Sequence, residues 1–132
     1  MLIPCEIAVK CLLPPVRALI AKTLTTKHKL TQKEAAKLLG ISQPAISLYE
    51  RKMRGKALNL ENEPEITKLI ENLADALAEG NLCHKEFIQM FCEICRTIRA
   101  EGLLCQLHKT FDSALDIEKC ELCLKTNALR CM

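Results

Sequence analysis

The chain has 132 residues, which allows one compact domain or two very small ones but not a large catalytic fold with its own deep cleft. The net charge is only +3, yet it is divided unevenly. Residues 1–58 hold eleven Lys or Arg against three acids, a net charge of +8, and residues 59–132 hold eight against thirteen, a net charge of −5. We therefore expect the two halves to face different partners, and a basic half of this size is what phosphate contacts require.

The cellular compartment decides how the nine cysteines are interpreted. Glu6, Lys10 and Arg17 interrupt the apolar runs near the N-terminus, and no small-residue cleavage site follows them. We therefore expect neither a signal peptide nor a membrane span, and a cytoplasmic protein. An odd number of cysteines in a reducing compartment fits poorly with a disulfide framework, which leaves metal ligation, redox chemistry or core packing.

Apolar residues recur at intervals of three and four along most of the chain, and no stretch alternates convincingly as a strand does. The predicted fold class is therefore all-α. Pro14 and Pro15 open the first long helix, because a proline in the first turn loses no hydrogen bond, and a shorter helix is expected before it over residues 4–13. Pro64 opens a later helix, and the last is expected over residues 85–100.

Two short capped helices are predicted within LTQKEAAKLLGISQPAISLYERKMRG, residues 30–55. Thr31 caps the first helix, where Glu34 completes a capping box, and Gly40 ends it. Ser42 caps the second helix, with Pro44 in its first turn. A turn of three residues separates the two helices, a spacing typical of a helix-turn-helix motif.

The second of these helices exposes short side chains at its start, where they can reach base edges in a DNA groove. Basic residues flank the motif as candidate phosphate contacts. Apart from Gln32, which is treated below, the candidate DNA-binding residues are Lys33, Ser42, Gln43, Pro44, Ser47, Arg51, Lys52 and Arg54, with Lys56 beside them.

Residues 30–55 resemble the helix-turn-helix of the phage-repressor class, and the preceding stretch PCEIAVKCLLPPVRALIAKTL resembles an archaeal family of such regulators. The resemblance covers roughly residues 1–58. It implies that Gln32 touches phosphate or braces a base-reading residue, and that Gln43, Pro44, Ser47 and Leu48 lie toward the major groove. Pro44 departs from the glutamine or serine often found at its position.

Proteins of this kind usually bind as homodimers, because one recognition helix reads only a few base pairs. The expected partner is therefore double-stranded DNA with a palindromic operator. An apolar stripe from Ile66 to Leu77 could supply the dimer contact, or it could cover the N-terminal bundle.

The C-terminal part of the chain contains pairs of soft metal ligands at one spacing, in the pattern C-x2-C-x9-C-x2-H-x11-C-x2-C. The predicted metal ligands are Cys92, Cys95, Cys105, Cys120 and Cys123, with His108 as a ligand or as a hydrogen-bond donor to a cluster. Cys105 is the least securely assigned, since it has no C-x-x-C partner. A thioredoxin-like dithiol would follow a strand, and none is predicted before this segment. Cys5, Cys11 and Cys131 lack a close ligand partner, which suits core packing.

An iron–sulfur cluster fits this ligand set better than zinc, and a 4Fe–4S cluster is favoured over 2Fe–2S. Zinc takes four ligands, so six candidates are too many for one ion and too few for two, and zinc pairs usually lie on tight knuckles rather than on a helix. A cluster takes four thiolates and can join cysteines from a helix and a loop. Zinc remains the alternative.

These observations predict a transcription regulator with a helix-turn-helix domain at residues 1–58, a linker and connecting or dimerisation helix at 59–81, and a cysteine-rich metal domain at 82–132. Its cluster is expected to sense redox state, oxygen or iron–sulfur status. In the alternative, a zinc ion is purely structural. We expect no enzyme activity and no small-molecule substrate, because no nucleophile has a partnered base and no glycine loop is suited to phosphate. His28 is expected to face solvent or a phosphate group.

Overall fold

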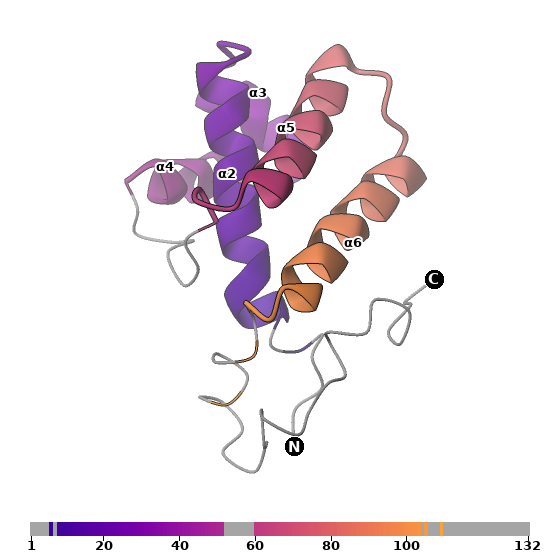
Figure 1. Cartoon of the computed structure of the whole chain (residues 1–132). Helices are drawn as coiled ribbons and strands as arrows, with labels where there is room; N and C mark the ends of the chain where they lie inside the picture. The colour runs from indigo at the N-terminus through magenta and orange to yellow at the C-terminus, as the bar shows by residue number, and fades with distance from the viewer. Residues whose placement is uncertain (1–5, 7, 52–59, 104, 106–108, 110–132) are drawn as a thin grey trace.

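The computed structural model describes residues 6, 8–51, 60–103, 105 and 109. A π-helix, η1 (Ala8–Leu12), runs directly into α2 (Leu13–Thr26), and the following helices are α3 (Gln32–Leu39), α4 (Gln43–Glu50), α5 (Pro64–Glu79) and α6 (His84–Ala100). Within this part of the chain there is no strand, so the predicted all-α fold class is confirmed (Figure 1). Of the helix expected over residues 4–13, the structure describes Glu6, which is helical, the π-helix η1, and Leu13 as the first residue of α2.

The helix ends lie where the sequence predicts them. The Thr31 hydroxyl accepts a hydrogen bond of 3.2 Å from the backbone N–H of Glu34, so Thr31 is the N-cap of α3. The Ser42 hydroxyl accepts one of 3.3 Å from the N–H of Ala45 and caps α4 in the same way. Each cap satisfies one of the N–H groups that the first turn of a helix leaves without an intrahelical partner.

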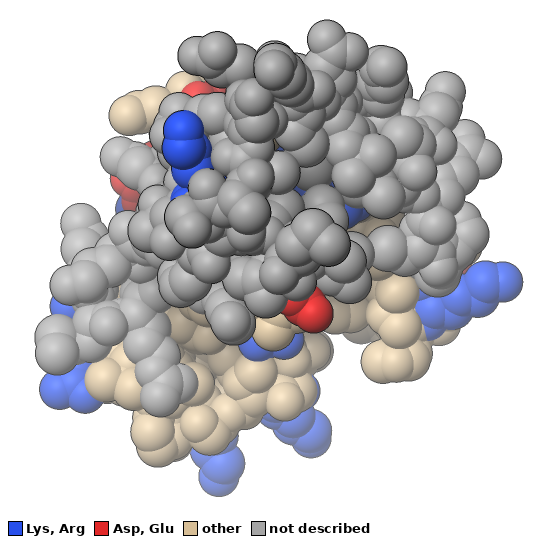
Figure 2. All heavy atoms as spheres, turned by 90° about the horizontal axis from the view of Figure 1, so that it is seen from below, with Lys and Arg blue, Asp and Glu red and all other residues tan. Residues whose placement is uncertain are grey.

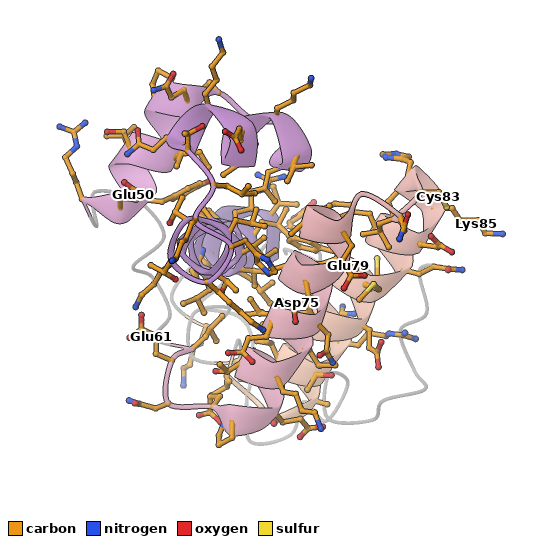
Figure 3. All side chains as sticks on the ribbon, turned by 90° about the horizontal axis from the view of Figure 1, so that it is seen from above. Glu50, Glu61, Asp75, Glu79, Cys83 and Lys85 are labelled. Carbon is orange, nitrogen blue, oxygen red and sulfur yellow. The ribbon has the colours of Figure 1, made fainter. Side chains whose placement is uncertain are left out.

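The helix α2 lies at the centre of the molecule and contacts α3, α4 and α5. Viewed along α2, the short helices α3 and α4 lie on one side and the longer helices α5 and α6 on the other (Figure 3). The buried apolar residues of all five helices form a single cluster. The residues that share this core therefore connect the two sides of the molecule through α2.

The apolar stripe of α5 is used inside the chain. Ile66, Ile70 and Leu73 are at most 1% exposed, and Leu77 is also buried. Because α5 contacts α2 on one side and α6 on the other, these side chains cover the N-terminal bundle. Of the two uses left open for this stripe, covering the N-terminal bundle is the one that its buried side chains have in this structure.

Leu60, which lies shortly before α5, belongs to the core as well. Leu60 is 1% exposed, and its carbonyl oxygen accepts a hydrogen bond from the backbone N–H of Glu63 at 3.1 Å. This contact fixes the chain just before α5 begins at Pro64.

No helix among the described residues is long and apolar enough to cross a membrane.

Candidate nucleic-acid interface

The turn between α3 and α4 has a defined hydrogen-bonding pattern. Gly40 has φ 68°, in the left-handed region that favours glycine. Its N–H donates to the carbonyl of Lys37 at 3.3 Å, and the N–H of Ile41 donates to the carbonyl of Ala36 at 3.0 Å. These two bonds form a Schellman motif, which ends α3 and directs the chain toward α4. Two backbone hydrogen bonds therefore close the turn, and its left-handed residue is the glycine that the sequence indicates.

Small buried residues let α3 and α4 pack closely. Ala35 and Ala36 on α3 and Ala45 on α4 are all buried, and Ile46 is fully buried beneath them. Tyr49 completes the buried face of α4. With this face fixed in the core, the opposite face of α4 is held in a constant direction toward solvent.

The predicted base-reading residues lie on that outer face and at the start of α4. Gln43 and Pro44 are exposed, while Ser47 and Leu48, one turn further along, are half-buried. The exposed Ser42 is also the helix cap, so its oxygen is already accepting a backbone hydrogen bond. The structure thus brings the start of α4 to the surface as predicted, with Gln43 the longest polar side chain there.

The predicted phosphate contacts divide into those that the structure describes and those that it does not. Lys33 at the start of α3 and Arg51 just after α4 are both exposed. Lys52 and Arg54, together with Lys56, lie outside the described residues. Viewed from below, Lys and Arg side chains project at several separate points of the described surface, rather than as one dense patch (Figure 2).

The first residue of α3 contacts the last residue of α4. The side-chain amide of Gln32 donates a hydrogen bond to the carboxylate of Glu50, which is 18 residues later in the chain. This bond joins the two helices at their outer ends, opposite the turn. Sequence reasoning assigned a role to Gln32 but missed Glu50, because nothing in the local pattern indicates a contact at that separation.

A second polar contact joins the end of α2 to α5. Asp75 Oδ1 lies 2.7 Å from His28 Nε2, and Asp75 Oδ2 lies 3.0 Å from Lys27 Nζ (Figure 3). The hydrogen bond with His28, and then that from Lys27, hold the pKa of Asp75 below its ordinary value, and the same contact raises the pKa of Lys27. The expectation that His28 faces solvent or phosphate is wrong, because its ring is half-buried and bonded to Asp75.

The predicted metal ligands are only partly described. Cys92 and Cys95 lie three residues apart on α6, on one side of the helix, and both are half-buried. Cys105 is also half-buried, and it follows Gly102, whose φ of 76° ends the helical path. Cys120, Cys123 and His108 lie outside the described residues.

The helix-borne pair fits two positions of a larger thiolate set. Two sulfurs at this spacing on one helix face can reach a common ion or cluster. Within the described part of the chain, no group of three or more His, Cys, Asp or Glu residues is arranged to hold a metal. The predicted ligand set extends beyond these residues to Cys120 and Cys123.

Cys83 is a further cysteine that sequence reasoning did not use. It is exposed and precedes α6 as the N-cap, and its backbone N–H donates to the Glu86 carboxylate at 3.0 Å. This hydrogen bond lowers the pKa of Glu86. The C-x-x-E spacing matches that of a capping box, with cysteine in place of the usual serine or threonine, and this is the signal that could have located the cap.

The comparisons with known proteins agree with the geometry of α2 to α4. Residues 20–62 match the family model described as helix-turn-helix. No curated protein and no solved structure gave a significant match. The matched residues include all of α3 and α4, so the predicted helix-turn-helix is confirmed, and the match supports a DNA-binding transcription regulator.

Proposed function

We propose that this protein regulates transcription by placing α4 in the major groove of double-stranded DNA. The observation that carries the proposal is the orientation of α4, whose buried face is locked against α3 while Gln43 is exposed at its start. A glutamine can form two hydrogen bonds with the edge of one base. Lys33 and Arg51, on either side of the motif, are suited to contact phosphates of the same groove.

Binding by one copy of α4 would recognise only a few base pairs. We therefore propose a homodimer that binds a palindromic operator, with its two half-sites about one helical turn of DNA apart. The contact between the two copies lies away from the α5 stripe, since Ile70, Leu73 and their neighbours are buried within one chain.

The test of DNA recognition begins with selection of bound sequences from a random duplex library by the full chain. We expect a two-fold symmetric sequence, and we expect Gln43→Ala to lose about 1–3 kcal/mol of discrimination at one base pair of each half-site. Gln89→Ala is the matched control, because Gln89 is an exposed glutamine on α6. Equal losses in both variants, or no enriched sequence, would contradict the proposal.

We further propose that the C-terminal cysteines hold an iron–sulfur cluster that makes DNA binding responsive to redox state, oxygen or iron–sulfur status. Cys92, Cys95, Cys105, Cys120 and Cys123 are the proposed ligands. Support comes from the half-buried pair on α6 and from the packing of α6 on α5, which in turn packs on α2. A bound cluster would supply a cross-link between α6 and the segment after it that depends on oxidation state.

The packing indicates how a change in that segment could reach the DNA-binding helices. A shift of α6 changes its contact with α5, and α5 holds the end of α2 through Asp75. The chain leads from His28 directly into α3, which begins at Gln32. A coupling of this kind requires that the two cluster states favour different arrangements of these helices.

Structural zinc is the second candidate, because a half-buried thiolate pair at i and i+3 also suits two ligands of a tetrahedral ion. Protein purified without oxygen should contain iron and sulfide and absorb visible light if the cluster is present, but should be colourless with zinc. Cys92→Ser should reduce the metal content, whereas Cys83→Ser, at the N-cap that precedes the same helix, should not. Equal operator affinity of metal-loaded and metal-free protein at fixed salt would contradict sensing.

A further inference from the structure

We propose that Glu50 is a positioning residue for DNA binding, which holds Gln32 in the orientation needed at the protein–DNA interface. The inference rests on the proposed function, since it concerns DNA binding by α3 and α4. It goes beyond that function because it assigns to an acidic residue a role that strengthens DNA binding. The charge of that residue by itself would repel DNA.

The two residues mark the outer ends of the helix-turn-helix. Gln32 is the first residue of α3 and is half-buried, while Glu50 is the last residue of α4 and is exposed. The Gln32 amide donates its hydrogen bond to the Glu50 carboxylate across these ends. Glu50 is labelled at the end of α4 in Figure 3. The bond adds a polar connection to a helix pair whose buried residues include small side chains such as Ala35 and Ala45.

The chemistry of the amide leaves it available for a second partner. A glutamine side chain offers two N–H donors and one carbonyl acceptor, and the bond to the carboxylate uses one donor. The second N–H remains for a phosphate or base of bound DNA. Because the first bond already fixes the side chain, binding costs less of the rotamer entropy that a long polar side chain would otherwise lose.

Because Glu50 is negatively charged, the direction in which DNA affinity changes when Glu50 is removed tests its role. Residues 1–58 contain only three acidic residues, and one of them is Glu50, beside the exposed Arg51. A carboxylate near DNA phosphates weakens binding through Coulomb repulsion. If Glu50 acted only through its charge, its removal would strengthen DNA binding. If it positions Gln32, its removal weakens binding despite the lost repulsion.

The experiment measures the affinity of the full chain for its selected duplex at fixed salt, with thermal unfolding of each variant as a check of folding. We expect Glu50→Ala to bind roughly three- to tenfold more weakly than the wild type. Glu50→Gln should bind within twofold of the wild type or more tightly, because its amide oxygen still accepts from Gln32 and carries no charge. In a Gln32→Ala background, Glu50→Ala should instead leave the affinity unchanged or raise it, since only the repulsion is then removed.

A shorter carboxylate provides a variant that keeps the charge. Glu50→Asp retains the negative charge but shortens the reach to Gln32, so we expect it to bind at least as weakly as Glu50→Ala. Equal or tighter binding by Glu50→Ala, or additive effects of the two alanine substitutions, would overturn the inference. If these outcomes occur while the wild-type chain binds its duplex, they contradict only the proposed role of Glu50. If the wild type binds no duplex, the proposed function itself is contradicted.

Discussion

The helix pairs α3–α4 and α5–α6 are joined in similar ways but contribute different things to the molecule. In each pair the first helix ends at a left-handed glycine, Gly40 in one and Gly80 in the other. The helices α3 and α4 have eight residues each, whereas α5 and α6 have 16 and 17. The short pair buries mainly alanines and leaves its polar ends exposed, whereas the long pair buries large aliphatic side chains.

The difference indicates a division between binding surface and core. Isolated helices of eight residues are unstable, so α3 and α4 depend on their caps and on packing against α2. The longer helices supply much of the buried apolar area on which this packing depends. The candidate DNA-binding surface is therefore stabilised by a region that carries the thiol groups, and the two regions should not unfold independently.

The largest expected effect tests whether the two regions share one core. Leu73 on α5 is fully buried, so Leu73→Ala should lower the free energy of unfolding by about 2–5 kcal/mol. Denaturant unfolding followed by circular dichroism should show one transition that includes α3 and α4. Leu38→Ala is the control, because Leu38 is 37% exposed and its truncation should cost less than about 1 kcal/mol. Two separate transitions would show that the regions are independent.

The helix caps provide the next test, and here the two regions should respond in opposite directions. Removing the hydroxyl cap of a short helix, by Thr31→Ala or Ser42→Ala, should cost about 1 kcal/mol of stability. At the start of α6, Cys83→Ser should instead raise the stability, since a serine oxygen accepts the capping bond better than sulfur. Thermal unfolding midpoints measure both effects, and a loss on Cys83→Ser would refute the comparison.

The left-handed residue that precedes the short helix pair and the one that joins the longer pair differ in type, since the first is a lysine and the second a glycine. Lys29, between α2 and α3, has φ 54°, which is costly for a residue with a Cβ, so Lys29→Gly should stabilise the protein by up to about 1 kcal/mol. Gly80 has φ 75° and no atom within 4 Å of an added Cβ, so Gly80→Ala should cost about 1 kcal/mol from backbone conformation alone. Shifts of the denaturation midpoint in the same direction for both variants would contradict this account.

The smallest expected effect concerns the contact between the regions at Asp75. A carboxyl group whose pKa is lowered by folding stabilises the folded state above its unfolded pKa, and this contribution is lost as the pH falls through the folded value. Asp75→Asn should therefore lower the unfolding midpoint at pH 7, with the difference from wild type shrinking below about pH 4. Thermal unfolding between pH 3 and pH 7 measures this difference, and a constant gap would argue against the ion pairs.

Glu101 provides a control, because its substitution should change the stability at pH 7 in the opposite direction. Its pKa is raised, first by burial and then by repulsion from Glu63 and Glu65, so its charge destabilises the folded state as the pH rises through that raised value. Glu101→Gln should accordingly raise the midpoint at pH 7 and have little effect at pH 3. A lower midpoint at pH 7 would contradict the repulsion between these carboxylates.

The features of the fold that sequence predicts are those set within a few residues of one another. The caps at Thr31 and Ser42, the stop at Gly40 and the start at Pro64 all follow from local backbone chemistry. The bond between Gln32 and Glu50 and the contacts of Asp75 join residues far apart in the chain, so local patterns did not indicate them. The cap at Cys83 was missed for another reason, because cysteine replaces the usual hydroxyl residue.

The candidate site follows the same division. The exposure of Gln43 and the burial of Ile46 follow from helical spacing on α4, so both were predictable. The use of the α5 stripe was not, because an apolar face at helical spacing fits equally well against a second chain or against α2. Its partner is decided by how the whole chain packs. The position of Cys92 and Cys95 on one face was likewise predictable from their spacing, whereas a site shared with later cysteines would depend on contacts between distant segments.

The salt dependence of DNA affinity tests the central claim most directly. Each neutralised phosphate should contribute about −0.9 to the slope of log K against log salt concentration. We predict a steep slope for the wild type and a slope shallower by about 2 when Lys33 and Arg51 are both replaced by alanine. The matched control replaces Lys68 and Lys85, exposed lysines on α5 and α6, and should keep the wild-type slope. Equal changes in slope for both pairs, or an affinity independent of salt, would contradict DNA binding by α3 and α4.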